Sequence, residues 1–192
     1  MKPTVTSGSF LLAAPSLSDP NFRRSVVLIC EHSDQGSMGL VVNRPLDASL
    51  AQLFAEIVDD GGVLPEKAGQ VFCGGPVEQN RLMALRAVDG DATGADHRVI
   101  DGVVLVDDIR AAVDAIARGE DEATSYRFLL GYAGWGAGQL DGELQEDSWI
   151  VRPATRELVF DVRSDAMWPN ALRELGGVYR LYAEMPSDPT VN

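Results

Sequence analysis

Residues 25–32 read SVVLICEH, a run of β-branched and apolar side chains that decides the fold class. Val26, Leu28 and Cys30 fall on one face of a strand, because side chains alternate between the two faces of β-structure. The residues between them are apolar as well. A strand that is apolar on both faces is typical of the middle of a sheet that is covered on both sides. We therefore expect this segment to be a central strand.

The segment that follows predicts a hairpin. Residues 33–36 (SDQG) are a turn signal, and Met38–Asn43 then reads as a second strand that ends at Pro45. Further strands are predicted at Gly69–Cys73, Arg81–Ala87, Val103–Val106, Tyr126–Ala133, Ser148–Arg152 and Leu158–Val162.

Amphipathic patterns predict the helices. Apolar residues recur at helical spacing over Leu50–Ile57, Ile109–Ala117 and Trp168–Leu175, and a short helix is predicted over 138–144. Because the hairpin comes early and isolated helices follow, the order does not fit a regular βαβ alternation. It predicts a single α+β domain over residues 1–192, with a mixed, largely antiparallel sheet, open or barrel-like, and helices packed against it.

Both ends of the chain are expected to be flexible, and the net charge limits which classes of partner the protein can bind. Residues 1–8 and 185–192 are small, polar or proline-containing, so we expect them to be flexible. The 16 Lys and Arg against 29 Asp and Glu give a net charge of −13. Such a surface repels phosphates and anionic lipids, which argues against direct nucleic-acid binding and against a membrane partner.

Motifs of common enzyme and metal classes are missing from the sequence. It has no phosphate-binding P-loop, no Gly-x-Ser-x-Gly nucleophile motif and no Cys-x-x-Cys pair, so no cofactor and no metal site is predicted. Cys30 and Cys73 are too few for a disulfide framework. Neither a signal peptide nor a membrane-spanning run is recognisable, and the expected location is the cytoplasm.

Two polar pairs are candidates for chemistry. Cys30 and His32 share one face of the predicted strand, about 7 Å apart along the chain, and could act as nucleophile and base. The alternative is a buried cysteine in the core and a histidine that bonds main chain at the strand end. Gln139 and Glu143 are four residues apart and share a helix face. The acidic pair at 107–108 reads as a helix cap.

Two glycine-rich turns could expose main-chain amides to a ligand. Gly134, Gly136 and Gly138 lie between a strand and a helix, and Gly74 and Gly75 end another strand. Free amides ahead of a helix bind anions, but a tight turn that holds Trp135 against the core needs the same glycines. The dinucleotide-binding pattern is incomplete, because residue 139 is glutamine where its last glycine would stand.

These landmarks resemble, in order, those of the YqgE/AlgH family across nearly the whole chain. The resemblance rests on FLLAAP at 10–15, DPNF at 19–22, EH at 31–32, GSMGLVVNRP at 36–45, GGPV at 74–77 and LGYAGWGAGQL at 130–140. Ser37 departs from the family's usual alanine. The resemblance implies a compact α+β protein of the bacterial cytoplasm. It also implies a role in transcriptional regulation, because the family is labelled as a transcriptional regulator. The charge argument makes that regulation indirect, since no basic helix-turn-helix is recognisable.

Three functional hypotheses stay open. The first is a binding or regulatory module for a small ligand or a protein partner. Its cleft would be lined by His32, Asn43, Arg81, Trp135, Gln139 and Glu143, beside the two glycine turns. The second is a hydrolase or transferase with His32 as base, Glu143 as acid or orienting group and Cys30 as a less favoured nucleophile. The third, least favoured, is a direct DNA-binding regulator. The sequence leaves open the ligand's identity, the oligomeric state and whether these residues converge in space.

Overall fold

The computed structural model describes residues 4–57, 69–90, 96–161 and 163–186. Its strands are β1 (Ser9–Ala13), β2 (Val26–Ser33), β3 (Gly36–Val41), β4 (Pro45–Ser49), β5 (Gln70–Cys73), β6 (Val77–Ala87), β7 (His97–Ile100), β8 (Val103–Leu105), β9 (Tyr126–Gly136) and β10 (Trp149–Pro153). Its helices are α1 (Leu50–Ile57), α2 (Ile109–Ala117), α3 (Gln139–Gln145), α4 (Arg156–Val159), α5 (Ser164–Leu175) and α6 (Val178–Ala183), with a 3-10 turn at Ala123–Ser125.

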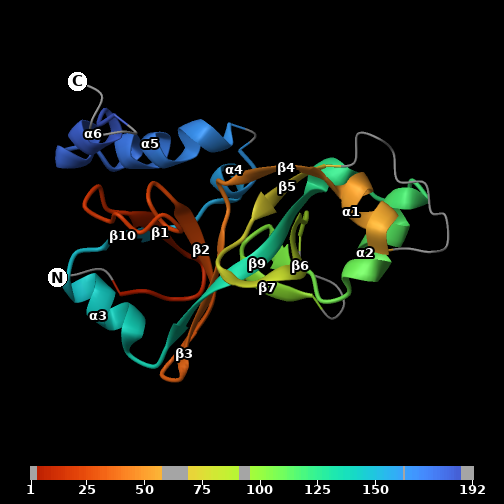
Figure 1. Ribbon diagram of the computed structural model, residues 1–192, viewed down its shortest axis with the longest axis horizontal. Coiled ribbons are helices and arrows are strands. Elements are labelled where there is room, and N and C mark those ends of the chain that lie inside the picture. Colours follow the sequence, from red (N-terminus) through yellow and green to blue (C-terminus); the bar gives the residue numbers. More distant parts are fainter. Residues whose placement is uncertain (1–3, 58–68, 91–95, 162, 187–192) are drawn as a thin grey trace.

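The chain forms a single α+β domain around one curled sheet (Figure 1). Eight strands follow the order β10-β1-β2-β3-β9-β6-β8-β7, with antiparallel neighbours throughout, and they curl into a half-barrel. β4 and β5 lie off this path, and β5 pairs with β9 in parallel. The predicted fold class, a mixed and largely antiparallel sheet with helices packed on it, is confirmed.

β2 is the central strand that its sequence predicts. It lies between β1 and β3, and its pairing with β3 forms the predicted hairpin. Leu28 and Cys30 pack in the core cluster inside the half-barrel, whereas Val27 and Ile29 pack in a second cluster on the opposite face. Both faces are covered, because helices lie on each side.

The helices are divided among the faces of the sheet (Figure 1). α4, α5 and α6 cover the face that contains Phe10, Leu12 and Leu28, where Trp168 is 1% exposed. α3 covers the opposite face of the same strands, and α1 and α2 cover the half formed by β5, β6 and β9. The predicted stripes of α1, α2 and α5 pack in these clusters through residues such as Leu50, Val113 and Trp168, whereas Leu175 at the end of α5 is 36% exposed.

Sequence patterns were wrong for one element and missed four. Leu158–Val162 was expected as a strand, but Leu158 and Val159 belong to α4, and residue 162 lies outside the described residues. The Thr155 hydroxyl caps α4 by accepting from the Leu158 amide. Local capping prevails over the β-favouring side chains of so short a segment. The sequence patterns predicted no strand or helix at β1, β4, β7 and α6. Each is only four to six residues long, too short to show a period.

Parts of the two ends fall outside the described residues. Residues 1–3 and 187–192, within the ends expected to be flexible, are among them. Closer to the body, Val5 is 4% exposed and packs in a core cluster, and the Met185 carbonyl accepts a hydrogen bond from Arg24. In the part of the chain that the structure describes, no helix is long and apolar enough to cross a lipid bilayer.

Candidate functional site

Glu143 lies at the centre of a tryptophan cluster between α3, β9 and β10. Its Oε2 accepts hydrogen bonds from the indole Nε1 of Trp135 at 2.9 Å and of Trp149 at 2.7 Å. Its Oε1 accepts from the Gln139 amide at 3.1 Å. Both tryptophans are 5% exposed, and their rings meet edge to face with centroids 6.1 Å apart. The carboxylate therefore holds three N–H donors, two of them buried.

The glycine-rich turn before α3 shapes this cluster. Gly138 precedes the helix with a φ of 71°, in the left-handed region that glycine tolerates. The side-chain Oε1 of Gln139 accepts from the main-chain amide of Gly136 at 3.1 Å. The Gln139 side chain therefore joins the turn to the carboxylate of Glu143. Gln139 and Glu143 share one face of α3, as their spacing predicts. The turn holds Trp135 against the core, as the structural interpretation of these glycines predicts.

His32 lies near the same end of the sheet but is exposed. Its Nδ1 is 2.8 Å from the Ser37 hydroxyl, its direct cross-strand partner in the β2–β3 hairpin. His32 lines two shallow hollows, one of 390 Å³ that also touches Trp135 and one of 260 Å³ that touches Gly136 and Gly138. The structure thus brings His32, Trp135 and this glycine turn together. In the described residues, the Ser37 hydroxyl orients this ring, and no carboxylate bonds to it.

Asn43 and Arg81 lie apart from these hollows. The Asn43 side chain joins two main-chain segments: it accepts from the Val26 amide at 2.8 Å and donates to the Arg24 carbonyl at 3.0 Å. Arg81 is exposed on β6 and pairs with Glu78 at 3.1 Å. Neither Asn43 nor Arg81 is among the described residues that line the two hollows at His32. Asn43 therefore has a structural role, and Arg81 belongs to another part of the surface.

Gly74 and Gly75 allow two strands to approach closely. A Cβ on Gly74 would lie 2.2 Å from the Gly131 carbonyl oxygen, and a Cβ on Gly75 would lie 2.2 Å from the Tyr132 carbonyl carbon. The Gly74 amide donates to the Leu130 carbonyl, and its own carbonyl accepts from Val41. This is where the neighbour of β9 changes from β5 to β3. The turn is explained by the path of the sheet.

Cys30 is unsuited to nucleophilic chemistry. It is 0% exposed and lies at an irregularity of β2, within the core cluster. Burial raises the pKa of its thiol far above the ordinary value. The core interpretation of this cysteine is the one that the geometry supports.

A hollow along the free edge of β10 was not predicted. It measures 680 Å³, and its floor is Trp149, Ile150 and Val151. Val178, Tyr179 and Tyr182 of α6 form one wall, and the end of α3 and the segment after β1 contribute the rest. This hollow could not be predicted from the sequence, because α6 has no recognisable pattern and lies next to β10 only in the folded chain.

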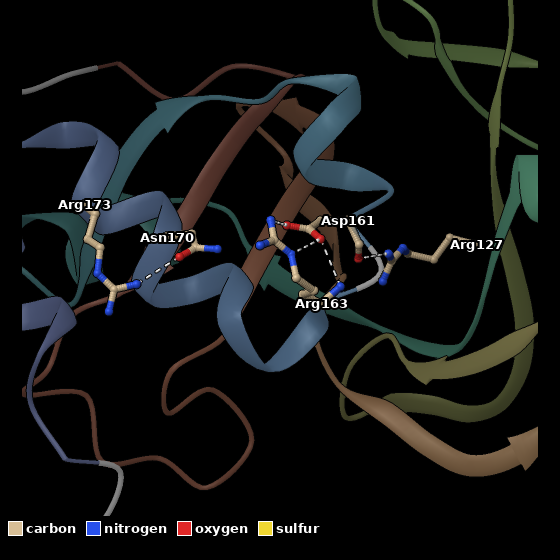
Figure 2. A network of polar contacts seen from close by, with 5 residues as sticks. All are labelled: Arg127, Asp161, Arg163, Asn170 and Arg173. Atoms are coloured by element: carbon tan, nitrogen blue, oxygen red, sulfur yellow. Dashed lines mark hydrogen bonds and ion pairs between the residues drawn. The ribbon is translucent and has the colours of Figure 1, made fainter.

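A buried arginine marks a second unpredicted feature. Arg127 follows Tyr126 within the apolar run YRFLLGYA, and it is 4% exposed in β9. Its guanidinium donates to the Val42 carbonyl. It also donates to the Asp161 carbonyl at 2.8 Å (Figure 2). Burial lowers its pKa to about 10. A cation within an apolar strand was the signal that could have found it.

Comparison with known proteins identifies the family. The AlgH-like family (DUF179) matches residues 10–180. A UPF0301 protein of Chlorobium limicola is 37% identical over 185 residues, which cover 96% of this chain and 95% of that protein. A UPF0301 protein of Bordetella pertussis is 39% identical over 173 residues, covering 90% of this chain and 84% of that one.

Solved structures agree. The solution structure of the AlgH protein from Pseudomonas aeruginosa is 31% identical, with a TM-score of 0.76 and 97% of each chain covered. The crystal structure of protein DIP2367 from Corynebacterium diphtheriae is 25% identical, with a TM-score of 0.77 and coverage of 96% of this chain and 95% of that one. By sequence and by fold, this chain belongs to the AlgH-like family.

Proposed function

We propose that this protein is a binding module that accepts an extended segment of a partner protein as an additional strand on β10. The observation that carries the proposal is the position of β10: an edge strand whose free side opens into the 680 Å³ hollow. An exposed sheet edge offers main-chain donors and acceptors to another chain, and proteins that do not use an edge usually cover or charge it.

The register of β10 shows which main-chain groups face outward. Its residues pair with β1 so that Ser148 accepts from Ala14 and Ala154 donates to Gly8, each at the end of the ladder. Bonded pairs alternate in an antiparallel ladder, so the amides and carbonyls of Trp149 and Val151 point to the free edge. In the described residues, no strand pairs with that edge.

The walls of the groove indicate the chemistry of the segment. Tyr179 and Tyr182 supply aromatic surface, and Val178 at the rim is 52% exposed. On the α3 side, the sequence between Arg127 and Arg152 contains only acidic charges. An apolar floor with an acidic flank fits an extended segment that alternates apolar and basic residues. The net charge of −13 favours the same partner.

Binding is favoured over catalysis by the state of the polar residues. Glu143 already accepts from three N–H groups, so its carboxylate has a structural use. His32 bonds to a cross-strand serine at the surface. A regulatory role carried by a docked protein segment requires no contact with DNA, which agrees with the acidic charge.

Synthetic peptides test the proposal directly. The probe is a fluorescent nonapeptide of alternating lysine and valine, with a glutamate–valine peptide as the control, and the Kd is measured by fluorescence anisotropy. We expect the basic peptide to bind and to weaken in high salt, because exposed charges are screened. Two further peptides carry N-methyl groups on the odd-numbered or on the even-numbered residues. Only one of the two should bind about tenfold or more weakly, since a strand bonds to its neighbour through alternate amides.

Two protein variants on one helix provide a matched pair. Val178→Lys puts a positive charge at the groove wall, and Leu181→Lys makes the same change at a residue that is 69% exposed and does not line the groove. Val178→Lys should weaken binding of the basic peptide, because it replaces apolar surface by a like charge, and Leu181→Lys should not. Equal binding of the two N-methylated peptides, equal effects of the two variants, or no binding of the basic peptide at about 1 mM would each refute the proposal.

A further inference from the structure

Arg127 is a buried cation whose hydrogen bonds go to main-chain carbonyls. Its two bonded nitrogens donate to main-chain carbonyls, and its Nε is buried with no acceptor. Among the described residues it forms no ion pair: the nearby Asp161 carboxylate is bonded by the Arg163 side chain and amide instead (Figure 2). Burying a charge is costly unless it is neutralised, and carbonyl dipoles do so only in part.

The guanidinium lies beside a hollow with aromatic walls. It stacks over the Phe72 ring with its central carbon 4.0 Å from the ring centroid. Arg127, Phe72 and Phe160 line a hollow of 330 Å³, small enough for one compact organic molecule. Arginine beside aromatic rings is suited to an anionic group, because its N–H donors match the oxygens of carboxylates and phosphates.

A second positive element faces the same hollow. Ser164, which is 9% exposed, lines it and is the first residue of α5, a helix of 12 residues. The side chain of the N-cap residue, Arg163, makes no capping bond, and the Asp161 carboxylate accepts from the Arg163 amide at 2.9 Å. The start of a helix carries partial positive charge and free amides, which favour an anion. Arg127 and the first residue of α5 therefore line one hollow, and the buried guanidinium is its main positive group.

We infer that this hollow binds a small organic anion, a carboxylate or phosphate monoester with a ring or short apolar group, anchored by Arg127 and the start of α5. The apolar part packs on Phe72 and Phe160, and the anionic oxygens accept from the guanidinium. The ligand neutralises the buried cation, so ligand binding and folding are linked. This site is separate from the β10 groove, and neither proposal depends on the other.

The experiment uses benzoate, phenyl phosphate and neutral benzamide as probes on the intact protein. Binding is measured by isothermal titration calorimetry, and the shift in melting temperature is recorded in parallel. We expect benzoate or phenyl phosphate to bind about 10- to 100-fold more tightly than benzamide, since a charge-assisted hydrogen bond is lost with the neutral ring. The ratio between benzoate and phenyl phosphate tells which class of anion the hollow prefers.

Variants place the probes in the hollow. Arg127→Gln should reduce benzoate affinity to that of benzamide. Ala123→Phe fills the hollow from its wall and leaves Arg127 intact, so it should abolish binding of all three probes even if Arg127→Gln fails to fold. Arg156→Gln, outside the residues that line this hollow, is the control and should bind as the wild type does. Equal affinity for benzoate and benzamide, no binding of either anion at about 10 mM, or undiminished binding by Ala123→Phe would overturn the inference.

Discussion

Replacing Glu143 by leucine tests whether this carboxylate is structural. The variant places an apolar side chain of similar size at this position of α3 and removes the acceptor of both indole N–H groups. Trp135 and Trp149 are each 5% exposed, so water cannot readily take the place of the carboxylate. The Gln139 amide loses its acceptor as well, but it lies at the surface and can bond to solvent.

The expected loss follows from the two indoles. A buried donor left without an acceptor costs about 1–3 kcal/mol, and Glu143 itself is half-buried, which moderates the loss. We therefore expect Glu143→Leu to lower the free energy of unfolding by about 2–5 kcal/mol. Glu143→Gln keeps a carbonyl oxygen for the indoles and should cost only about 1 kcal/mol.

Urea denaturation followed by tryptophan fluorescence and circular dichroism measures these differences. For a protein of this size, the expected loss moves the midpoint of unfolding by about 1–2 M urea. Glu146→Leu is the matched control, because Glu146 is exposed one turn later, bonds to neither indole and should change stability by less than about 0.5 kcal/mol. If Glu143→Leu were as stable as this control, the carboxylate would not hold the tryptophan cluster and would again be a candidate for chemistry.

Three further changes test other parts of the structure. Gly74→Ala should prevent soluble folding or cost more than about 3 kcal/mol, because its Cβ would lie 2.2 Å from a carbonyl oxygen, whereas Gly142→Ala, in α3 with open space around it, should gain about 0.5–1 kcal/mol; similar urea midpoints would contradict this. Asn43→Ala removes a side chain that bonds two main-chain groups and should cost about 1–3 kcal/mol by urea denaturation, so a neutral effect would refute its structural role. Cys30, buried and with a raised thiol pKa, should react with a thiol reagent only after unfolding, while the partly exposed Cys73 reacts in the native protein; two equally fast thiols would show that the core around β2 is open.

Local patterns predicted much of the fold because they report which face of a segment is buried. The two apolar faces of SVVLICEH indicated a central strand, and the turn at 33–36 indicated its hairpin partner. The stripes of α1 and α2 indicated helices that cover the sheet. The strand expected at Leu158–Val162 failed, because a four-residue helix depends on one cap and its neighbours more than on side-chain preference.

The candidate site was predictable only where its residues are close in sequence. Gln139 and Glu143 share a helix turn, so their contact followed from spacing alone. That Glu143 bonds both Trp135 and Trp149 depends on how β9 and β10 pack against α3. His32 and Asn43 both belong to the hairpin region, yet the chain uses one at the surface and the other as a link between main-chain segments.

By itself, the sequence determined the class of fold, the hairpin, three of the larger helices and the acidic surface, since periodicity, turn residues and charge are properties of short segments. Only the tertiary structure decided that β10 is left at the sheet edge beside α6, and that Arg127 is buried beside Phe72 and the start of α5. These features join segments far apart in the chain. No local pattern encodes them, because they arise from which elements become neighbours when the curled sheet forms.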